Sequence, residues 1–436
     1  MKTVIFRRLA QAGAASTLAL IGTGAAHASG FYLQEQSVVA AGRAFSGEAA
    51  DQGASSLWWN PAAIAGNEKS TAYLGFSAIL PKGKVRNNSS VIARPGQAAA
   101  PVGGNQVSVN PLKKGYLPSG AVAWKLNDQW SVGLAFTAPY SFATNYEDNS
   151  WARYTADKTK LTTIDLQPTI AFAPSPLIGI GVGLNVEHSK ASLSNSLPNL
   201  SAALPDGHQT LRGKGWDVGY SVGVQIHPSK IIDLGFSYKS SVKHKLKGSV
   251  TTAGLLGPLA GQNGRLDDIT ATFRTPWQAV ASARVHVNEQ LTLNGQVVRA
   301  GWKKFDAIRL GAPLNAALDQ NYRNSWSVAG GVDYAVTPQW TMRGGVQWDQ
   351  TPTQDGFRDA RVPDASRINF AIGTSYAITD SITLDAAANY IDFKNASIDR
   401  PGGFYVGSQA QTIIQPNGSL TGARAIILAV GGRMSF

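Results

Sequence analysis

The sequence contains no cysteine among its 436 residues, and charged residues make up only 15% of it. The lack of cysteine excludes disulfide bonds and thiolate chemistry. The charged fraction lies well below the ~25% of ordinary globular proteins. Beyond residues 1–28 the chain also has no run of ~18 consecutive apolar residues, which excludes membrane-spanning helices.

Glycine and aromatic residues, by contrast, are abundant. The chain has 46 Gly, 11 Trp and 13 Tyr, and 43% of its residues are hydrophobic. A transmembrane β-barrel combines these properties, because its apolar residues alternate with small or polar ones and never form a long run. We therefore expect a barrel rather than a helical membrane protein.

Residues 1–28 have the three parts of a secretory signal peptide. Lys2, Arg7 and Arg8 form a basic start, residues 9–23 form a weakly apolar stretch, and Ala26-His27-Ala28 is a small-x-small cleavage site. We expect cleavage after Ala28 and export of the remaining chain.

The segment after the signal peptide does not alternate like a strand. Residues 29–65 mix Ala, Gly and Ser with isolated apolar anchors, namely Phe31, Leu33, Phe45, Leu57, Trp58 and Trp59. This composition favours short helical turns packed against a larger structure. We interpret residues 29–68 as an N-terminal hatch that plugs a barrel formed by residues 69–436.

From Lys69 onward the sequence has a period of two, which predicts β-strands. In residues 177–187, Ile178, Ile180, Val182, Leu184 and Val186 alternate with Gly179, Gly181, Gly183, Asn185 and Glu187. Short breaks alternate with long Gly-, Pro- and Asn-rich segments, as expected of a barrel with a periplasmic and an extracellular rim. An outer-membrane antiparallel barrel of fourteen strands follows, over residues 69–80, 117–126, 129–146, 158–173, 177–192, 213–227, 231–250, 267–286, 290–307, 323–335, 339–349, 365–378, 381–396 and 421–436.

The last predicted strand is amphipathic and ends in Phe436. Such a terminal strand resembles the signal read by the outer-membrane insertion machinery, which we expect to be a partner of this chain. Basic residues outnumber acidic ones, which gives the chain a formal net charge of +12. For an exported barrel, this charge favours phosphate-bearing outer-leaflet lipid, including lipopolysaccharide, over nucleic acid as a further partner. We expect a monomer in the outer membrane of a Gram-negative cell.

The mature N-terminus resembles the FadL/TodX family of outer-membrane transporters for hydrophobic compounds. The resemblance lies in Ser29-Gly30-Phe31, Glu35-Gln36-Ser37, the run from Gly42 to Gly47, and Asn60-Pro61-Ala62, and it continues diffusely along the chain. It implies a fourteen-stranded barrel blocked by the hatch, with capture of substrate among the outer loops. It also implies an inner pocket and passive, sideways release through a kinked strand.

The resemblance assigns two elements of the hatch to the gate. Asn60, Pro61 and Ala62 would seal the hatch against the wall, although a turn leading into the first strand explains the same tripeptide, since Pro61 fixes φ and restrains Asn60. Phe31 would enter the substrate pocket and couple the N-terminus to its occupancy. Simple packing against the wall is the alternative for Phe31.

The third predicted strand contains Pro139, followed by Tyr140. A proline inside a strand deletes a ladder hydrogen bond, so these residues could form the lateral exit. Alternatively, the strand ends there and residues 139–157 form a loop.

Leucines in two long loops could form an outer hydrophobic groove, because apolar residues on an exposed rim are costly unless they bind something or pack together. The spacing of the first four predicts one face of a helix. Mutual packing of the two loops is the alternative. The residues are Leu193, Leu197, Leu200 and Leu204, with Leu255, Leu256 and Leu259.

A fatty acid also needs a cation for its carboxylate. Lys190 and Arg309 stand at positions that, by the resemblance, face the inner pocket, although outer-rim charges facing solvent or lipid A fit equally. Lys243, Lys245 and Lys247 share the odd numbering of the lumenal set of their strand yet lie near its outer end, and they remain unassigned.

Long-chain fatty acids are therefore the expected substrates, and monoaromatic hydrocarbons such as toluene are the alternative. A water-filled diffusion porin is a second alternative, which the small residues of the inner faces and the hatch argue against. The six His show neither a catalytic motif nor metal-ligand spacing. We expect no enzyme activity, cofactor or metal.

Overall fold

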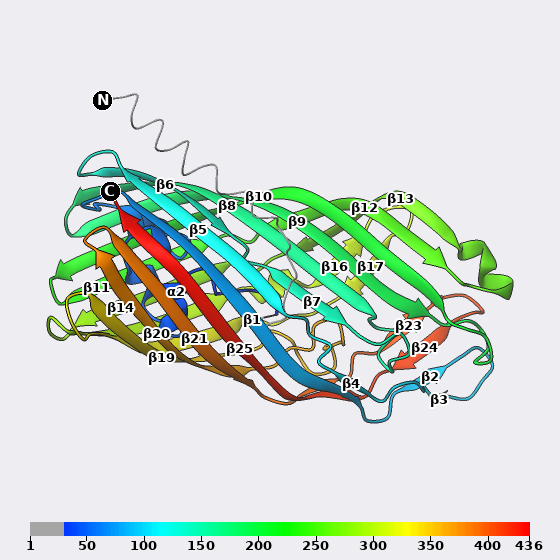
Figure 1. Ribbon diagram of the computed structural model, residues 1–436. Coiled ribbons are helices and arrows are strands. Elements are labelled where there is room, and N and C mark those ends of the chain that lie inside the picture. Colours follow the sequence, from blue (N-terminus) through cyan, green and yellow to red (C-terminus); the bar gives the residue numbers. More distant parts are fainter. Residues whose placement is uncertain (1–29) are drawn as a thin grey trace.

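The computed structural model describes residues 30–436 and forms one long twisted barrel (Figure 1). The predicted signal peptide, residues 1–28, and Ser29 lie outside the described residues. Within residues 30–436, no helix is long and apolar enough to cross a membrane.

The barrel is closed and has fourteen antiparallel strands, which confirms the predicted fold. The first strand pairs with both the second and the last. Several strands are interrupted near their middle and continue under a second label. The strands are β1 (Thr71–Asn87), β5 (Gly115–Lys125), β6 (Trp130–Thr137) with β7 (Ser141–Asn145), β8 (Lys158–Ser175), β9 (Ile178–Leu197), β10 (Gly207–Ser229), β11 (Ile232–Lys239) with β12 (Lys243–Ala253), β13 (Gly264–Arg274) with β14 (Gln278–His286), β15 (Leu291–Ala300) with β16 (Ala307–Leu310), β17 (Ala316–Asp319) with β18 (Ser325–Ala335), β19 (Trp340–Asp349), β20 (Arg367–Thr379), β21 (Ile382–Phe393) with β22 (Ala396–Ile398), and β25 (Gly418–Ser435).

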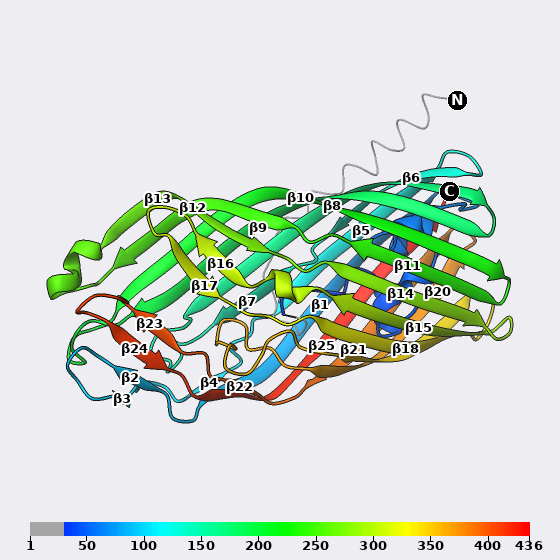
Figure 2. The ribbon, with the colours of Figure 1, turned by 180° about the vertical axis from the view of Figure 1, so that it is seen from behind.

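One rim has short turns and the other carries the long connections, as Figures 1 and 2 show. The C-terminus lies at the rim with short turns. The opposite rim carries a small second sheet of β2 (Val91–Ala93), β3 (Ala100–Pro101), β23 (Gly402–Phe404) and β24 (Thr412–Gln415), together with β4 (Val107–Val109) and the 3₁₀ turn η4 (Gly257–Gln262). We take the rim with short turns as periplasmic.

The apolar face of the strands points outward. In β9 the exposed residues are Ile178, Ile180, Val182 and Leu184, whereas the intervening glycines are buried. A surface of this kind is stable in lipid and unfavourable in water. The alternation seen in the sequence therefore places lipid-facing side chains on the outside of the barrel.

Residues 30–70 lie inside the barrel, nearer its periplasmic end (Figure 1, blue). They form α2 (Val38–Gly42) and three 3₁₀ turns, η1 (Glu48–Ala50), η2 (Ala54–Ser56) and η3 (Pro61–Ile64). Ser37 caps α2 by accepting a hydrogen bond from the Ala40 amide, and Asn60 caps η3 through the Ala62 amide. These local caps explain why the segment forms helical turns rather than a strand.

Glycines on the lumenal faces of the strands let the hatch approach the wall closely. A Cβ atom at Gly181 would overlap the Pro61 carbonyl, and one at Gly223 would overlap the Asn60 side chain. Similar overlaps would occur between Gly235 and Ala49, Gly345 and Arg43, and Gly373 and Gly42. The abundant glycine of the inner faces thus shapes a lumen that fits this hatch.

The helix predicted from the leucine spacing in 193–204 is wrong. β9 continues to Leu197 and β10 begins at Gly207, and these two residues are paired across the strands. Cross-strand pairing therefore overrides the four-three-four spacing, which is a weak local signal in a segment this short.

Candidate functional site: a lumenal cavity beside an interrupted wall

An apolar cavity lies in the lumen above the hatch, in the outer half of the barrel. Its present volume is about 60 Å³, far below the ~300 Å³ or more of typical ligand pockets. Its apolar walls come from the hatch, seven strand segments and the connections beside them, and four polar side chains join them. The apolar residues include Phe31, Phe142, Leu161, Leu193, Leu211, Leu246, Phe273, Phe305, Ile308 and Val362, and the polar ones are Thr159, Lys160, Gln320 and Arg361.

Phe31 of the hatch is surrounded by aromatic side chains. Its ring centroid lies 4.9 Å from that of Trp302 and 5.0 Å from that of Phe305, both in edge-to-face geometry. Phe142 and Tyr140 lie within 5.9 Å of it. Trp302 itself belongs to the short 3₁₀ turn η5 (Trp302–Lys304), where β15 is interrupted. The side chain of Phe31 is 1% exposed, so it fills space that a ligand could otherwise take.

The wall beside this cavity is interrupted at Pro139. Pairing between β5 and β6 ends at Gly120 and Phe136, and pairing between the two chain segments resumes only at an isolated bridge between Leu112 and Thr144. Residues 138–140 belong to no strand. The missing N–H of Pro139 explains why the ladder is not continuous here.

The hatch occupies the hydrogen-bonding groups that the interruption leaves open. The Leu33 amide donates to the Pro139 carbonyl at 2.8 Å, and the Ser141 amide donates to the Phe31 carbonyl at 3.0 Å. The Gln36 side chain accepts from the Ala138 amide and donates to its carbonyl. Phe31 therefore belongs both to the cavity and to the segment that covers the gap.

A second pocket of about 340 Å³ opens in the wall at this gap. It is bordered by β5, by Phe136 and Ala138 on the interrupted strand, and by outward-facing residues of β8 and β9. Lys160 and Ala191 line both this wall pocket and the lumenal cavity. The two spaces are thus adjacent and share part of their lining.

The structure does not place Lys190 and Arg309 in the inner pocket. Lys190 is exposed on the outward face of β9 and lines the wall pocket, because the alternation that begins at Ile178 continues through it without a shift. Arg309 is exposed and donates to Asp306. The cation of the lumenal cavity is instead Arg361, while Lys160, exposed on the outward face of β8, borders both this cavity and the wall pocket.

Arg361 lies in the long connection between β19 and β20, where the sequence has no periodic pattern that could have revealed it. Its guanidinium donates to the Asn195 side chain at 3.1 Å and to the Ser194 carbonyl. Among residues 30–436, no carboxylate forms an ion pair with it. Arg361 could therefore accept an incoming anion without breaking an existing pair.

The loop leucines separate into three groups. Leu197, Leu255 and Leu259 are buried against one another, with Leu200 packed beside them. Leu193 lines the lumenal cavity. Leu204 and Leu256 remain 40% exposed on the extracellular rim. Mutual packing thus accounts for the first group.

Asn60 joins the hatch to the barrel wall. Its side-chain amide donates to the Ala49 carbonyl at 2.6 Å and to the Val224 carbonyl at 3.2 Å. Its side-chain oxygen accepts from the Ala62 amide. Pro61 and Ala62 lie against Gly181 of β9.

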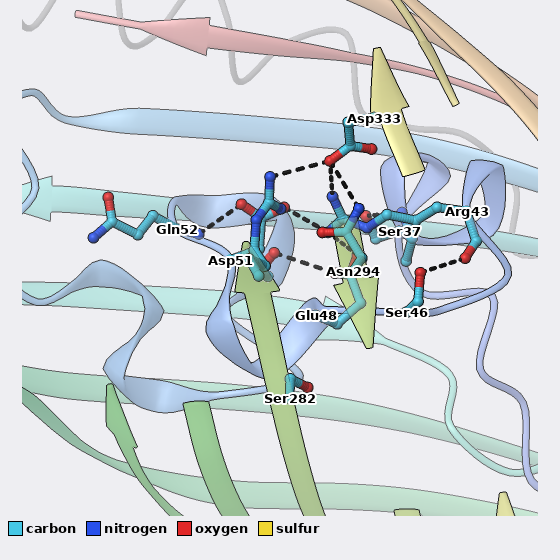
Figure 3. A network of polar contacts seen from close by, with 12 residues as sticks. Ser37, Arg43, Ser46, Glu48, Asp51, Gln52, Ser282, Asn294 and Asp333 are labelled. Atoms are coloured by element: carbon cyan, nitrogen blue, oxygen red, sulfur yellow. Dashed lines mark hydrogen bonds and ion pairs between the residues drawn. The ribbon is translucent and has the colours of Figure 1, made fainter. Parts of the chain in front are cut away.

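A buried charge network holds the other side of the hatch (Figure 3). Arg43 is 1% exposed and pairs with Glu48, with Asp51 at 2.6 Å and with Asp333 of β18 at 3.0 Å. Arg284 of β14 bridges Asp51 and Asp333. Removing one member of such a buried network typically costs 3–5 kcal/mol, so this network resists displacement of the hatch.

Asp364 holds the first described residue of the hatch. Its carboxyl accepts a hydrogen bond from the Gly30 amide at 3.1 Å and another from the Thr351 hydroxyl. Burial raises the pKa of Asp364 to about 7. This carboxyl can therefore change its protonation state near neutral pH.

Tertiary structure also assembles a serine, a histidine and a carboxylate that no sequence motif predicted. The Ser189 hydroxyl lies 3.2 Å from Nδ1 of His244, and Glu187 lies 3.1 Å from its Nε2. Ser189 and His244 are fully buried and border neither the lumenal cavity nor the wall pocket. They could not meet a substrate in this arrangement, and within the described part of the chain no cluster could hold a metal ion.

A family model described as outer membrane protein transport protein (OMPP1/FadL/TodX) matches residues 19–436. A long-chain fatty acid transport protein of Escherichia coli O6:H1 is 26% identical over 410 residues, which cover 86% of this chain and 90% of that protein. A 47 kDa outer membrane protein of Pasteurella multocida is 25% identical over 414 residues, covering 89% and 92% of the two chains.

Solved structures show the same fold. A FadL homologue from Pseudomonas aeruginosa has a TM-score of 0.80 at 22% identity and covers 93% of this chain and 100% of its own. The toluene transporter TbuX of Ralstonia pickettii has a TM-score of 0.65 at 16% identity, with 92% and 98% covered. The family match spans nearly the whole chain and agrees with the closed, hatch-filled barrel, so this protein belongs to the OMPP1/FadL/TodX family of outer-membrane transport proteins.

Proposed function

We propose that this protein takes up long-chain fatty acids across the outer membrane by passive diffusion. The observation that carries the proposal is the apolar lumenal cavity with Arg361 on its wall, whose guanidinium forms no ion pair with a carboxylate among the described residues and is held instead by Asn195 and Ser194. An apolar cavity suits an acyl chain, and a guanidinium suits its carboxylate. We infer a transport role rather than catalysis.

In the proposed path, substrate is first captured at the extracellular rim, where Leu204 and Leu256 are exposed. It then enters the lumenal cavity. Because the cavity is too small for an acyl chain while Phe31 fills it, substrate must displace Phe31. The carboxylate would meet Arg361 or Lys160.

Displacement of Phe31 would loosen the hatch where it covers the wall. The same short segment carries the hydrogen bonds to Pro139 and Ser141, so moving it uncovers the gap at Pro139 and Tyr140. Substrate would then leave sideways through the wall pocket. Asn60, Pro61 and Ala62 would keep the rest of the hatch in place, because they contact the wall on the side of β9 and β10.

Monoaromatic hydrocarbons remain the second candidate substrates. The observation that favours them is the aromatic lining of the cavity, in which Phe31, Phe142, Phe273 and Phe305 take part. A toluene-sized molecule needs no cation. A water-filled porin is disfavoured because residues 30–70 lie inside the barrel, nearer its periplasmic end, where their side chains are largely buried against the wall.

The test is uptake by a host strain that lacks its own transporter of this family. Strains carrying the wild type, Arg361→Gln or Arg309→Gln are given labelled oleate or labelled toluene. Arg361→Gln should lose a charge-assisted hydrogen bond to the carboxylate, which is worth ~1.5–3 kcal/mol. The oleate concentration that gives half-maximal uptake should therefore rise roughly tenfold or more. The matched Arg309→Gln control, with its charge at the surface, should behave as wild type.

Three outcomes separate the candidates. Oleate uptake that depends on the protein and on Arg361 supports the fatty-acid proposal. Uptake of toluene alone would replace it with the hydrocarbon alternative. Uptake of both compounds at the rate of the empty strain would contradict transport of either.

A further inference from the structure

The outer surface of the barrel carries a dense group of cations on neighbouring strands. Lys190 of β9 is directly opposite Lys214 of β10, which in turn is directly opposite Lys247 of β12. Directly paired residues share a face of the sheet, and all three side chains are exposed. The three ammonium groups therefore form a row across three adjacent strands.

Further cations extend this row. Arg212, Lys243, Lys245 and Arg274 are exposed on the same surface, and Lys243 is directly opposite Arg274 on β13. We call the group of Lys190, Arg212, Lys214, Lys243, Lys245, Lys247 and Arg274 the basic band. Within residues 30–436, none of these side chains forms an ion pair with a carboxylate.

Placing like charges directly opposite each other destabilises a sheet. The basic band contains three such pairs, namely Lys190–Lys214, Lys214–Lys247 and Lys243–Arg274. A counter-anion that bridges the strands would remove this cost. The arrangement therefore fits a ligand with more than one negative charge.

The position of these cations along the barrel axis indicates that the anion belongs to a membrane lipid. Directly below Lys214 on the same face of β10 lie Trp216, Val218 and Tyr220, exposed by 63%, 65% and 51%. This surface is stable only against lipid tails. The Lys190–Lys214–Lys247 row thus begins where the lipid-facing surface of β10 ends, on the side of the long extracellular loops.

The distance to the opposite rim agrees with this placement. Lys214 lies about twelve residues from the periplasmic turn after Ile226, which is roughly 30 Å along the barrel axis at a rise of ~3.3 Å and a tilt of ~40°. The apolar belt of such barrels is about 25 Å tall. The Lys190–Lys214–Lys247 row is consequently at the height of the outer-leaflet headgroups.

We propose that the basic band is a binding site for the phosphorylated headgroup of an outer-leaflet glycolipid of the lipid A class. The phosphates would lie across Lys190, Lys214 and Lys247. The acyl chains would continue down over Trp216 and Val218. This site is on the outside of the barrel; Lys190 also borders the wall pocket, whereas Lys214 and Lys247 border neither that pocket nor the lumenal cavity.

The test compares Lys214→Gln/Lys247→Gln with a matched control, Lys69→Gln/Lys230→Gln. The control removes two exposed lysines at the periplasmic rim, so the change in net charge is the same. Each purified full-length barrel in detergent is titrated with bis-phosphorylated lipid A, with the same lipid after phosphatase treatment, and with inorganic phosphate. Bound species are counted by native mass spectrometry.

Two cations near a headgroup should account for a roughly 30-fold change in affinity. We expect that loss for bis-phosphorylated lipid A in Lys214→Gln/Lys247→Gln and no loss in the control. Dephosphorylated lipid A should bind wild type as weakly as the variant binds the intact lipid, and added salt should weaken wild-type binding. Inorganic phosphate should not displace the lipid.

Equal binding of phosphorylated and dephosphorylated lipid A to wild type would overturn the proposal. So would an equal loss in the periplasmic-rim control, because net charge would then be responsible. Retention of inorganic phosphate without lipid would assign the site to a soluble anion instead. Heat-dependent mobility in electrophoresis verifies that each variant is folded. The salt and phosphatase experiments use only the wild-type protein, so they test the proposal even if a variant fails to fold.

Discussion

At the scale of single residues, buried polar groups hold the hatch while leaving it able to respond. Asp364 is the clearest case, since its buried carboxyl binds the Gly30 amide and has a pKa of about 7 instead of the ordinary 3.8. The folded protein therefore keeps a proton that the unfolded chain releases above pH ~4. Stability contributed by this group is full at low pH and falls as pH rises toward 7.

The raised pKa of Asp364 should make the stability of the folded protein depend on pH. Between pH 5 and pH 8 the wild type should lose about 2–3 kcal/mol from Asp364, seen as a lower midpoint of thermal unfolding. Asp364→Asn keeps an acceptor for Gly30 but cannot ionise, so its midpoint should change less over the same range. An exposed control, Asp267→Asn, should retain the wild-type difference; an equal slope in Asp364→Asn would refute the assignment.

At the scale of elements, the hatch and the strands fit because the wall lacks side chains where they meet. η3 contacts β9 and β10 at Gly181 and Gly223, and α2 contacts β20 at Gly373. Every such glycine replaces a side chain that would push the hatch away. The fit is therefore a property of pairs of elements and not of the hatch alone.

Substitution of Gly223 by Leu tests this fit. The new side chain would occupy the place of the Asn60 side chain, and overpacking of this kind typically costs 1–3 kcal/mol. We expect a displaced hatch and a raised single-channel conductance in planar bilayers. Gly330→Leu is the matched control, because Gly330 is exposed in β18 and has open space around it; equal conductance in the two variants would argue against the fit.

At the scale of the whole molecule, the barrel and the hatch have separate sources of stability. The barrel closes through a long ladder between β1 and β25, broken by one register shift between Lys82 and Lys84, whereas the hatch is held by side chains, charges and the short pairing at the wall gap. The barrel should therefore persist without its hatch. Its lumen would then fill with water.

Deletion of residues 31–65 tests this separation. The truncated barrel should still fold, show heat-dependent mobility in electrophoresis and conduct ions as an open pore. Purified full-length protein measured in the same bilayer is the reference. A conductance as low as that of the full chain would mean that the hatch does not plug the lumen.

The sequence by itself determined the number of strands and the outward direction of their apolar faces. Both follow from a local period of two and from the alternation of short and long breaks. The helical turns of the hatch are equally local, because Ser37 and Asn60 cap them from neighbouring positions.

Only tertiary structure decided which residues from distant strands meet. Lys243, Lys245 and Lys247 carry odd numbers, as lumenal residues of β11 do, but residues 240–242 interrupt the strand and turn these lysines outward. The neighbours of Phe31, and the place of Arg361 on the cavity wall, likewise depend on closure of the barrel. The physical reason is that strand pairing brings together residues that are far apart in the sequence. The register of that pairing is not encoded in the local pattern of either strand.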